Sequence, residues 1–350
     1  MNCKTRVSQA AGKLDWTSGC ALLGGIGWVV LPVLSAKGSF FRGAIEQLFL
    51  FAPLVVVPLA FGVAERLVPS EGEWWLGHLP RCLQPFGAAA AVASFALAPG
   101  RLAALVALGW FIVTGSAALY ATRRLLSRGL GNLAETCVDA AFLYLPIGGA
   151  WLVLSRAGMT PIGFKEPIVL LTAVHFHYSA FAAPIVVGAF ARAIGNPSGG
   201  RSAALRAVAA GVIVAPGLLA LGFVVSPGLK VLSALVLTIS LGGLAILTLG
   251  SLSLIERPLA RVLLAVSAGS VLAGMSLASV YAVGDFFGRQ LISIPWMARL
   301  HGVINSFGFA LCGLIAWTVA PPQLAQGHLV SPDYLKSERR AVHVSTGKQP

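Results

Sequence analysis

Apolar residues run in blocks of about 20 along almost the whole chain, with short polar or basic stretches between them. A block of this length is enough for one helix to cross the hydrocarbon core of a bilayer. The blocks are apolar on all sides and lack the alternating pattern of membrane β-barrel strands. The pattern therefore predicts ten membrane-spanning helices, at residues 17–36, 45–64, 83–99, 102–121, 134–154, 167–191, 203–224, 229–254, 259–283 and 292–319.

The composition supports this class of fold. Hydrophobic residues make up 57% of the 350 positions and charged residues only 11%, whereas about a quarter of a soluble chain is charged. The mean hydropathy is +0.84. We therefore expect an all-α, polytopic transmembrane helical bundle that lies in the inner (plasma) membrane of the cell.

The positions of lysine and arginine predict the orientation of this bundle. When the N-terminus is placed in the cytoplasm, about two thirds of the 25 basic residues fall in cytoplasmic segments, as the positive-inside rule requires. Both termini are then cytoplasmic. Most segments between spans are too short to fold alone, so we expect a cytoplasmic tail over residues 1–16, a single transmembrane domain over 17–321 and a disordered cytoplasmic tail over 322–350.

The net charge of +13 changes this interpretation little. Basic residues in cytoplasmic loops attract anionic lipid headgroups, so the bilayer is the expected partner and nucleic acid is not. The five cysteines show no CxxC spacing, which argues against a disulfide framework and a thiolate metal site. Nucleotide-binding and zinc-protease motifs are missing from the sequence, so we expect neither a cofactor nor a metal.

Two acidic residues inside the fifth predicted span are candidates for proton chemistry. Glu135 and Asp139 are four positions apart, so their side chains share a helix face. Two carboxylates this close in a medium of low polarity do not both ionise easily, and one that keeps its proton can act as a general acid. In the alternative interpretation, Glu135 is solvated at the interface or paired with Arg128, and Asp139 caps a neighbouring group.

The sixth predicted span contains a second group of polar side chains, in the stretch VHFHYSAF at residues 174–181. His175 and His177 are two apart and point to different sides of a regular helix, so they form a poor chelate. His175 and Tyr178 share a face, and His177 would have to meet a carboxylate from another span. The alternative is that both histidines are hydrogen-bonded core residues.

Further polar residues lie near the predicted outer side of the membrane. Asp285 is four residues before Arg289, a spacing that suits a salt bridge, and His301 shares a face with Asn305. Glu46 begins the second span. The histidines of the sixth span fall in the same outer half, whereas the carboxylates of the fifth span fall in the inner half, so two polar layers are expected rather than one pocket.

The stretch from Trp151 to Gly188 contains a recognisable set of residues: Gly158, Pro161, Gly163, Phe164, Leu171, Thr172, His175, Phe176, His177, Tyr178, Phe181 and Pro184. On these residues, the stretch resembles the YndJ-like family of bacterial polytopic membrane proteins. The resemblance implies a helical membrane protein and little chemistry, because the family has no settled activity. A more general similarity of type is to small integral-membrane terpene cyclases.

These residues favour a membrane enzyme that isomerises or cyclises a lipophilic, isoprenoid substrate by protonating it. Asp139 or Glu135 would be the acid, and the face formed by His175 and Tyr178 would orient it or accept the final proton, with His177 as a further candidate. Aromatic faces would stabilise a cationic intermediate. The expected substrate-binding residues are Phe176, Phe181, Trp151, Asn305 and Asp285.

Three other functions remain open at this point. A proton-coupled transporter or efflux carrier would use the same carboxylates and histidines as a relay. A metal or haem site would be built on His175, His177 and His301. The simplest alternative is a helical scaffold whose polar residues only fix the packing. The sequence leaves the oligomeric state open.

Overall fold

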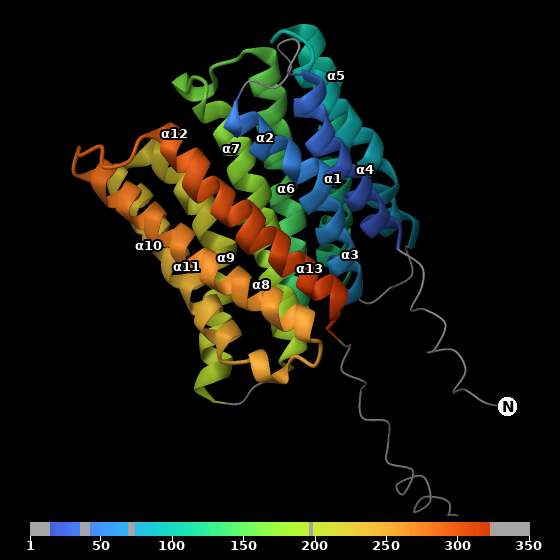
Figure 1. The fold of residues 1–350 in the computed structure, drawn as a ribbon, viewed down its shortest axis with the longest axis vertical. Helices are drawn as coiled ribbons and strands as arrows, with labels where there is room; N and C mark the ends of the chain where they lie inside the picture. The colour runs from blue at the N-terminus through green and yellow to red at the C-terminus, as the bar shows by residue number, and fades with distance from the viewer. Residues whose placement is uncertain (1–14, 36–42, 69–73, 196–198, 323–350) are drawn as a thin grey trace, which may run out of the picture.

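The computed structural model describes all residues except 1–14, 36–42, 69–73, 196–198 and 323–350 (Figure 1). The described residues form ten helical rods, and the longest connections among them carry short 3-10 turns at Pro161–Gly163 (η3) and Leu252–Leu254 (η5). Seven rods are single α-helices: α1 Trp16–Ser35, α4 Trp74–Phe95, α5 Arg101–Arg128, α6 Leu133–Ala157, α9 Gly200–Val225, α10 Pro227–Leu249 and α11 Pro258–Phe286.

The other three rods each join α-helical and π-helical segments. The second rod contains α2 Ala44–Phe51, η2 Ala52–Val56 and α3 Val57–Leu67. The sixth contains α7 Ile168–His177, η4 Tyr178–Ala182 and α8 Ala183–Ala193. The last contains α12 Ile294–Met297, η6 Ala298–Gly302, η7 Ile304–Leu311 and α13 Cys312–Val319.

The predicted all-α bundle is confirmed, and each predicted span corresponds to one rod. Eight of the described rods are long and apolar enough to cross a membrane. The other two are α1, whose apolar stretch is the shorter segment Trp16–Pro32, and α4, in which Arg81 and Gln84 interrupt the apolar sequence.

Both ends of the described bundle lie on the same side. Arg66, near the end of α3, forms an ion pair with Asp15 just before α1 (2.7 Å). The same guanidinium donates to the carbonyl oxygen of Thr318 near the end of α13 (3.1 Å). A chain that starts and ends on one side crosses the bundle an even number of times, as predicted. The cytoplasmic assignment of this side remains a prediction, and the two tails lie almost entirely outside the described residues.

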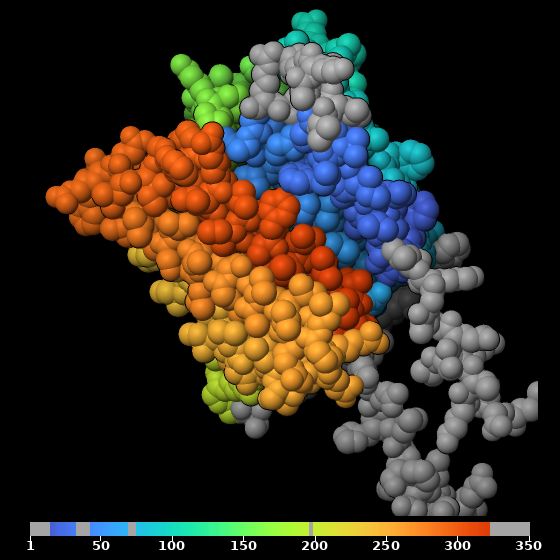
Figure 2. Space-filling model, in the orientation of Figure 1, coloured from blue at the N-terminus to red at the C-terminus, as the bar shows by residue number. Residues whose placement is uncertain are grey.

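The second and sixth rods occupy the interior of the bundle. In their most apolar 18-residue windows, 89% and 72% of the residues are buried, compared with 33% in α9 and in α11. Figure 2 shows the last rod on the viewed face, between α1 on one side and α11 on the other. The α9 and α11 helices therefore present broad apolar faces to lipid, while the π-containing rods pack inside the bundle or across its face.

Proline accounts for two of the π-helical segments. Pro58 and Pro184 each follow a π segment by two residues, and neither has an N–H to donate to the carbonyl four residues earlier. Those carbonyls belong to Leu54 and Ala180, which lie inside η2 and η4. The widened π turn accommodates the proline ring and the carbonyl that has lost its helical partner.

Side chains add hydrogen bonds to backbone carbonyls in the last rod. The amide of Asn305 donates to the carbonyl oxygen of His301 (2.8 Å), and the thiol of Cys312 donates to that of Phe307 (3.2 Å). Such insertions into the helical ladder are a recognised cause of irregular turns. Small residues bring α11 close to this rod, since a Cβ on Gly274 would lie 2.2 Å from the Asn305 side chain.

The first helix packs directly on the backbone of η2. A Cβ atom on Gly24 would lie only 1.9 Å from the carbonyl oxygen of Leu54. Only glycine therefore permits this approach, which brings α1 against the carbonyl that Pro58 has deprived of its helical donor. In a membrane such an exposed carbonyl must be covered by protein.

We predict that Gly24→Ala destabilises the bundle by about 1–3 kcal/mol, because α1 has to move away from η2. The check is the thermal unfolding midpoint of the purified chain in detergent. Gly27→Ala is the matched control, since a Cβ there has no neighbour within 4 Å. Equal midpoints for the two variants would show that the contact between α1 and Leu54 is not needed.

Candidate functional site

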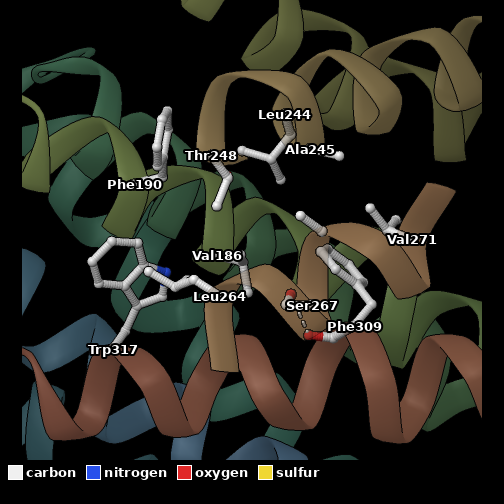
Figure 3. Close-up of a pocket in the computed structure, with 11 residues that line it drawn as sticks. Val186, Phe190, Leu244, Ala245, Thr248, Leu264, Ser267, Val271, Phe309 and Trp317 are labelled. Atoms are coloured by element: carbon white, nitrogen blue, oxygen red, sulfur yellow. Dashed lines mark hydrogen bonds between the residues drawn. The ribbon is translucent and has the colours of Figure 1, made fainter. Parts of the chain in front are cut away.

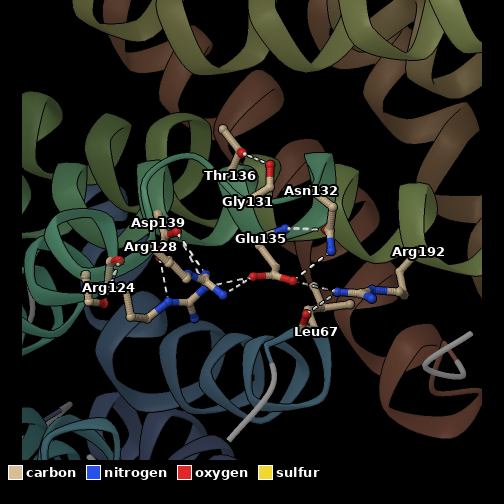
Figure 4. A network of polar contacts seen from close by, with 10 residues as sticks. Leu67, Arg124, Arg128, Gly131, Asn132, Glu135, Thr136, Asp139 and Arg192 are labelled. Atoms are coloured by element: carbon tan, nitrogen blue, oxygen red, sulfur yellow. Dashed lines mark hydrogen bonds and ion pairs between the residues drawn. The ribbon is translucent and has the colours of Figure 1, made fainter. Parts of the chain in front are cut away.

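Three arginines surround the two carboxylates predicted in the fifth span (Figure 4). Glu135 is 5% exposed and Asp139 is 1% exposed. The Nε and Nη2 atoms of Arg124 lie 3.0 and 3.4 Å from the Asp139 carboxylate. Arg128 forms ion pairs with both carboxylates, and Arg192 lies 3.5 Å from Glu135. These five side chains are called the arginine cluster below.

The arginine cluster joins the ends of four helices at one end of the bundle. Arg124 and Arg128 lie in the last turns of α5, and Arg192 lies in the last turn of α8. Asn132 caps α6 by accepting from the backbone N–H of Glu135 (3.2 Å), and its amide donates to the Glu135 carboxylate (2.7 Å). Arg192 also donates to the carbonyl oxygen of Leu67 at the end of α3 (2.5 Å).

This geometry changes the expectation for the two acids. The sequence-based hypothesis considered two carboxylates facing each other, whereas each one here faces guanidinium groups that stabilise its negative charge. The pairing of Glu135 with Arg128, one of the two interpretations left open, is present. The catalytic role of Glu135 and Asp139 stays a prediction, and it would have to work against these ion pairs.

His177 is a fully hydrogen-bonded core residue. Its Nε2 accepts from the indole N–H of Trp110 (3.0 Å), and its Nδ1–H donates to the carbonyl oxygen of Ala173 (2.7 Å). The ring stacks on Trp110 and meets the Phe49 ring edge-on. Gly148 of α6 provides the space, since a Cβ there would lie 2.6 Å from Nδ1. Both ring nitrogens are thus occupied, which favours the structural interpretation of His177.

His175 differs from His177 in having a buried ring nitrogen, Nε2, with no hydrogen-bond partner. The side chain is only partly buried, although it lies inside the sixth rod. His301 lies on the last rod, which contacts the sixth rod through η7 and η4. The Nδ1–H of His301 donates to the carbonyl oxygen of Gly274 (2.8 Å) and so fixes that ring against α11. We refer to His175 and His301 as the histidine pair.

Tyr178 connects two of the π-containing rods near the histidine pair. Its phenol donates to the carbonyl oxygen of Leu48 (2.9 Å), one turn before η2. The backbone N–H of Ala52, which would bond to this carbonyl in a regular helix, instead bonds to Phe49. The predicted pair of His175 and Tyr178 is therefore formed by neighbours on one rod, with the phenol already engaged.

The polar residues form two layers, as expected. Arg192 follows His175 by 17 residues along the sixth rod, a separation of roughly 25 Å at 1.5 Å per residue. The arginine cluster and the histidine pair therefore lie toward opposite ends of the bundle. This separation argues against a single pocket in which Asp139 donates a proton and His175 later receives it.

The predicted substrate-binding residues are spread over the bundle. Phe176 contacts Tyr144, Phe181 packs between Phe61 and Phe142, and Trp151 contacts Phe164. Asn305 lies beside His301. Asp285 forms its ion pair with Lys230 of α10 (2.5 Å), rather than with Arg289 as its spacing suggested.

Sequence reasoning missed several residues that organise the site. Trp110 and Gly148 hold His177 from two other helices. Arg156 is buried and donates to the carbonyl oxygens of Ser94 (3.3 Å) and Leu97 (2.9 Å), and so closes the end of α4. Arg156 lies within the stretch of family resemblance, and a charged residue inside an apolar run could have marked it as a candidate. No comparable pattern in the sequence marks Trp110.

A cavity lies between α8, α10, α11 and the last rod (Figure 3). Its volume of about 10 Å³ is close to the minimum for one water molecule. The pocket for a drug-sized ligand usually measures at least about 300 Å³, so an isoprenoid substrate does not fit this cavity. Among the described residues, no group of three or more His, Cys, Asp or Glu side chains is arranged to hold a metal ion.

We predict that Asp139→Asn destabilises the chain by about 3–5 kcal/mol, because it removes one of only two carboxylates that balance three buried or half-buried arginines. Asp285→Asn is the control, since that carboxylate is 40% exposed in its ion pair and such pairs contribute about 1 kcal/mol or less. Thermal unfolding in detergent measures both. An Asp139→Asn chain as stable as the control would contradict a structural role for the arginine cluster.

Comparison with known proteins agrees with this fold. Residues 47–309 match the family described as YndJ-like protein. A curated relative from Bacillus subtilis (strain 168), described as uncharacterized membrane protein YndJ, is 29% identical over 276 residues, which are 78% of this chain and 48% of the relative. This chain thus spans about half the length of that relative. No solved structure matches this chain. The chain belongs to the YndJ-like family of membrane proteins.

Proposed function

We propose that this membrane protein is a proton-coupled carrier in the inner (plasma) membrane, in which the histidine pair binds the proton. The observation that carries the proposal is the position of His175 and His301. The two rods that carry these imidazoles contact each other through η4 and η7, and His175 has a buried ring nitrogen with no hydrogen-bond partner. Ionisable groups held inside a membrane bundle commonly mark ion or proton pathways.

The irregular helices around the histidine pair support a carrier. His175 lies three residues before η4, and His301 lies within η6. π-helical turns are frequent at functional sites, and transporters bind substrates and ions where helices are interrupted. Segments with fewer regular hydrogen bonds have more freedom to change conformation.

The arginine cluster supports the same proposal from the other end. It links the ends of α3, α5, α6 and α8 through ion pairs and hydrogen bonds. A carrier that exposes one central site alternately to two sides needs a closed end, and ion pairs that can separate provide one. On the predicted orientation, this closed end faces the cytoplasm.

An isomerase or cyclase is the second candidate. The observation in its favour is the partner-free nitrogen of His175 next to apolar and aromatic side chains, including Phe176. In that case His175 would be the better proton-handling group than Asp139, because it has no counter-charge among its described contacts. The isoprenoid substrate would have to enter from lipid after a change in conformation.

The carrier is tested by proton flux through liposomes that contain the purified full-length chain. A pH difference is imposed across the membrane, potassium and valinomycin hold the voltage near zero, and an internal dye reports pH. Sodium and inorganic phosphate are supplied one at a time as co-solutes, with potassium present throughout. We expect the wild-type chain to dissipate the pH difference with at least one of them, and His175→Gln to slow this flux about tenfold or more.

His78→Gln is the matched control, since His78 lies on α4 and bonds to Arg81 rather than to the histidine pair. It should keep the wild-type flux. Wild-type liposomes that behave like protein-free liposomes with every one of these solutes, or His175→Gln liposomes that behave like wild type, would overturn the proposal.

A further inference from the structure

The arginine cluster contains more hydrogen-bond donors than its carboxylates can accept. Each guanidinium has five N–H groups, and each carboxylate has about four acceptor sites. Three guanidiniums against two carboxylates also leave a surplus of one positive charge within the cluster. Glu135 already accepts from Asn132 and faces all three arginines, so its oxygens have little capacity left.

Several guanidinium nitrogens in this cluster are buried without a hydrogen-bond partner. The Nη1 of Arg124, the Nε of Arg128 and the Nε of Arg192 are all of this kind. The Arg124 side chain is only 8% exposed. Its guanidinium lies over the Tyr120 ring, 5.5 Å from the centroid, which contacts the face of the cation but leaves the in-plane N–H groups unpaired. A buried cationic donor without an acceptor is costly.

The cluster lies where an anion can reach it. Arg128 and Arg192 occupy the last turns of α5 and α8, and their side chains are 19% and 14% exposed. They form the accessible edge of the cluster, while Arg124 lies deeper. The ends of membrane-spanning helices lie at the level of the lipid headgroups. Guanidinium groups are well suited to phosphate oxygens because their planar fork of donors can bind two of them at once.

We propose that Arg124, Arg128 and Arg192 form a binding site for a phosphate group, supplied either by an anionic phospholipid or by free inorganic phosphate. The phosphate oxygens accept from the accessible edges of Arg128 and Arg192, and the negative charge of the phosphate offsets the surplus positive charge to which the deeper Arg124 contributes. This site is separate from the histidine pair and does not depend on the protein being a carrier.

The test measures binding to the purified full-length chain in a neutral detergent. One arm records the unfolding midpoint in sodium phosphate against sodium chloride of equal ionic strength. The other arm titrates phosphatidylglycerol against the uncharged lipid diacylglycerol and counts bound lipids by native mass spectrometry. We expect stabilisation or retention in at least one arm. A response to phosphate identifies the free anion as a ligand, and a response to phosphatidylglycerol identifies the headgroup.

Two variants with opposite expected effects keep the test decisive. Arg192→Gln removes one donor group and should weaken binding about tenfold. Glu135→Gln removes a negative charge that competes with phosphate, so it should strengthen binding by a similar factor. This variant tests the phosphate site if Arg192→Gln does not fold. Arg299→Gln is the control, because Arg299 stacks on Trp296 in the last rod, away from the cluster.

The proposal is overturned if phosphate and chloride stabilise the wild-type chain equally and phosphatidylglycerol is not retained above diacylglycerol. It is also overturned if binding occurs but neither Arg192→Gln nor Glu135→Gln changes it relative to Arg299→Gln.

Discussion

A backbone carbonyl that loses its helical partner inside a membrane must be met by another group of the protein, because lipid offers no hydrogen-bond donor. Three rods of this bundle are interrupted by π segments, and groups from neighbouring rods or from the same rod meet their carbonyl oxygens. Gly24 lets α1 cover the carbonyl of Leu54, the phenol of Tyr178 donates to Leu48, and Asn305 donates to His301. The interrupted rods are stable only when packed against neighbours, which is why two of them lie at the centre.

The ionisable side chains lie either beside these irregular segments or at the ends of regular helices. The histidine pair lies beside η4 and within η6, in the irregular part of the bundle. The arginine cluster lies instead among regular helix ends, where Arg192 meets the terminal carbonyl of α3 and Asn132 caps α6. In the proposed carrier, the layer of irregular helices changes conformation, while the ion pairs of the other layer close one end of the bundle and separate when it opens. The predicted cyclase would instead need an acid free of counter-charge, which Glu135 and Asp139 are not.

Local features of the chain were predictable, and contacts between distant segments were not. Ten helical segments could be predicted because apolar length is a property of each segment alone, although α4 begins at Trp74 and its predicted span at residue 83. The interruption at Pro184 follows from the missing N–H of proline. Hydropathy could not show that Ala44–Leu67 is central, because lipid and a helical core are equally apolar. The pairing of His177 with Trp110 and of Asp285 with Lys230 joins residues 67 and 55 positions apart, and depends on helix register.

The most direct test of the carrier is whether water reaches position 175 from one side of the membrane. In a chain freed of its other cysteines, His175→Cys is exposed in liposomes to a charged, membrane-impermeant thiol reagent. A chain that keeps only the buried Cys137 provides the baseline. The proposed carrier predicts labelling of position 175 much faster than of Cys137. Labelling of position 175 no faster than of Cys137, from either side, would contradict it.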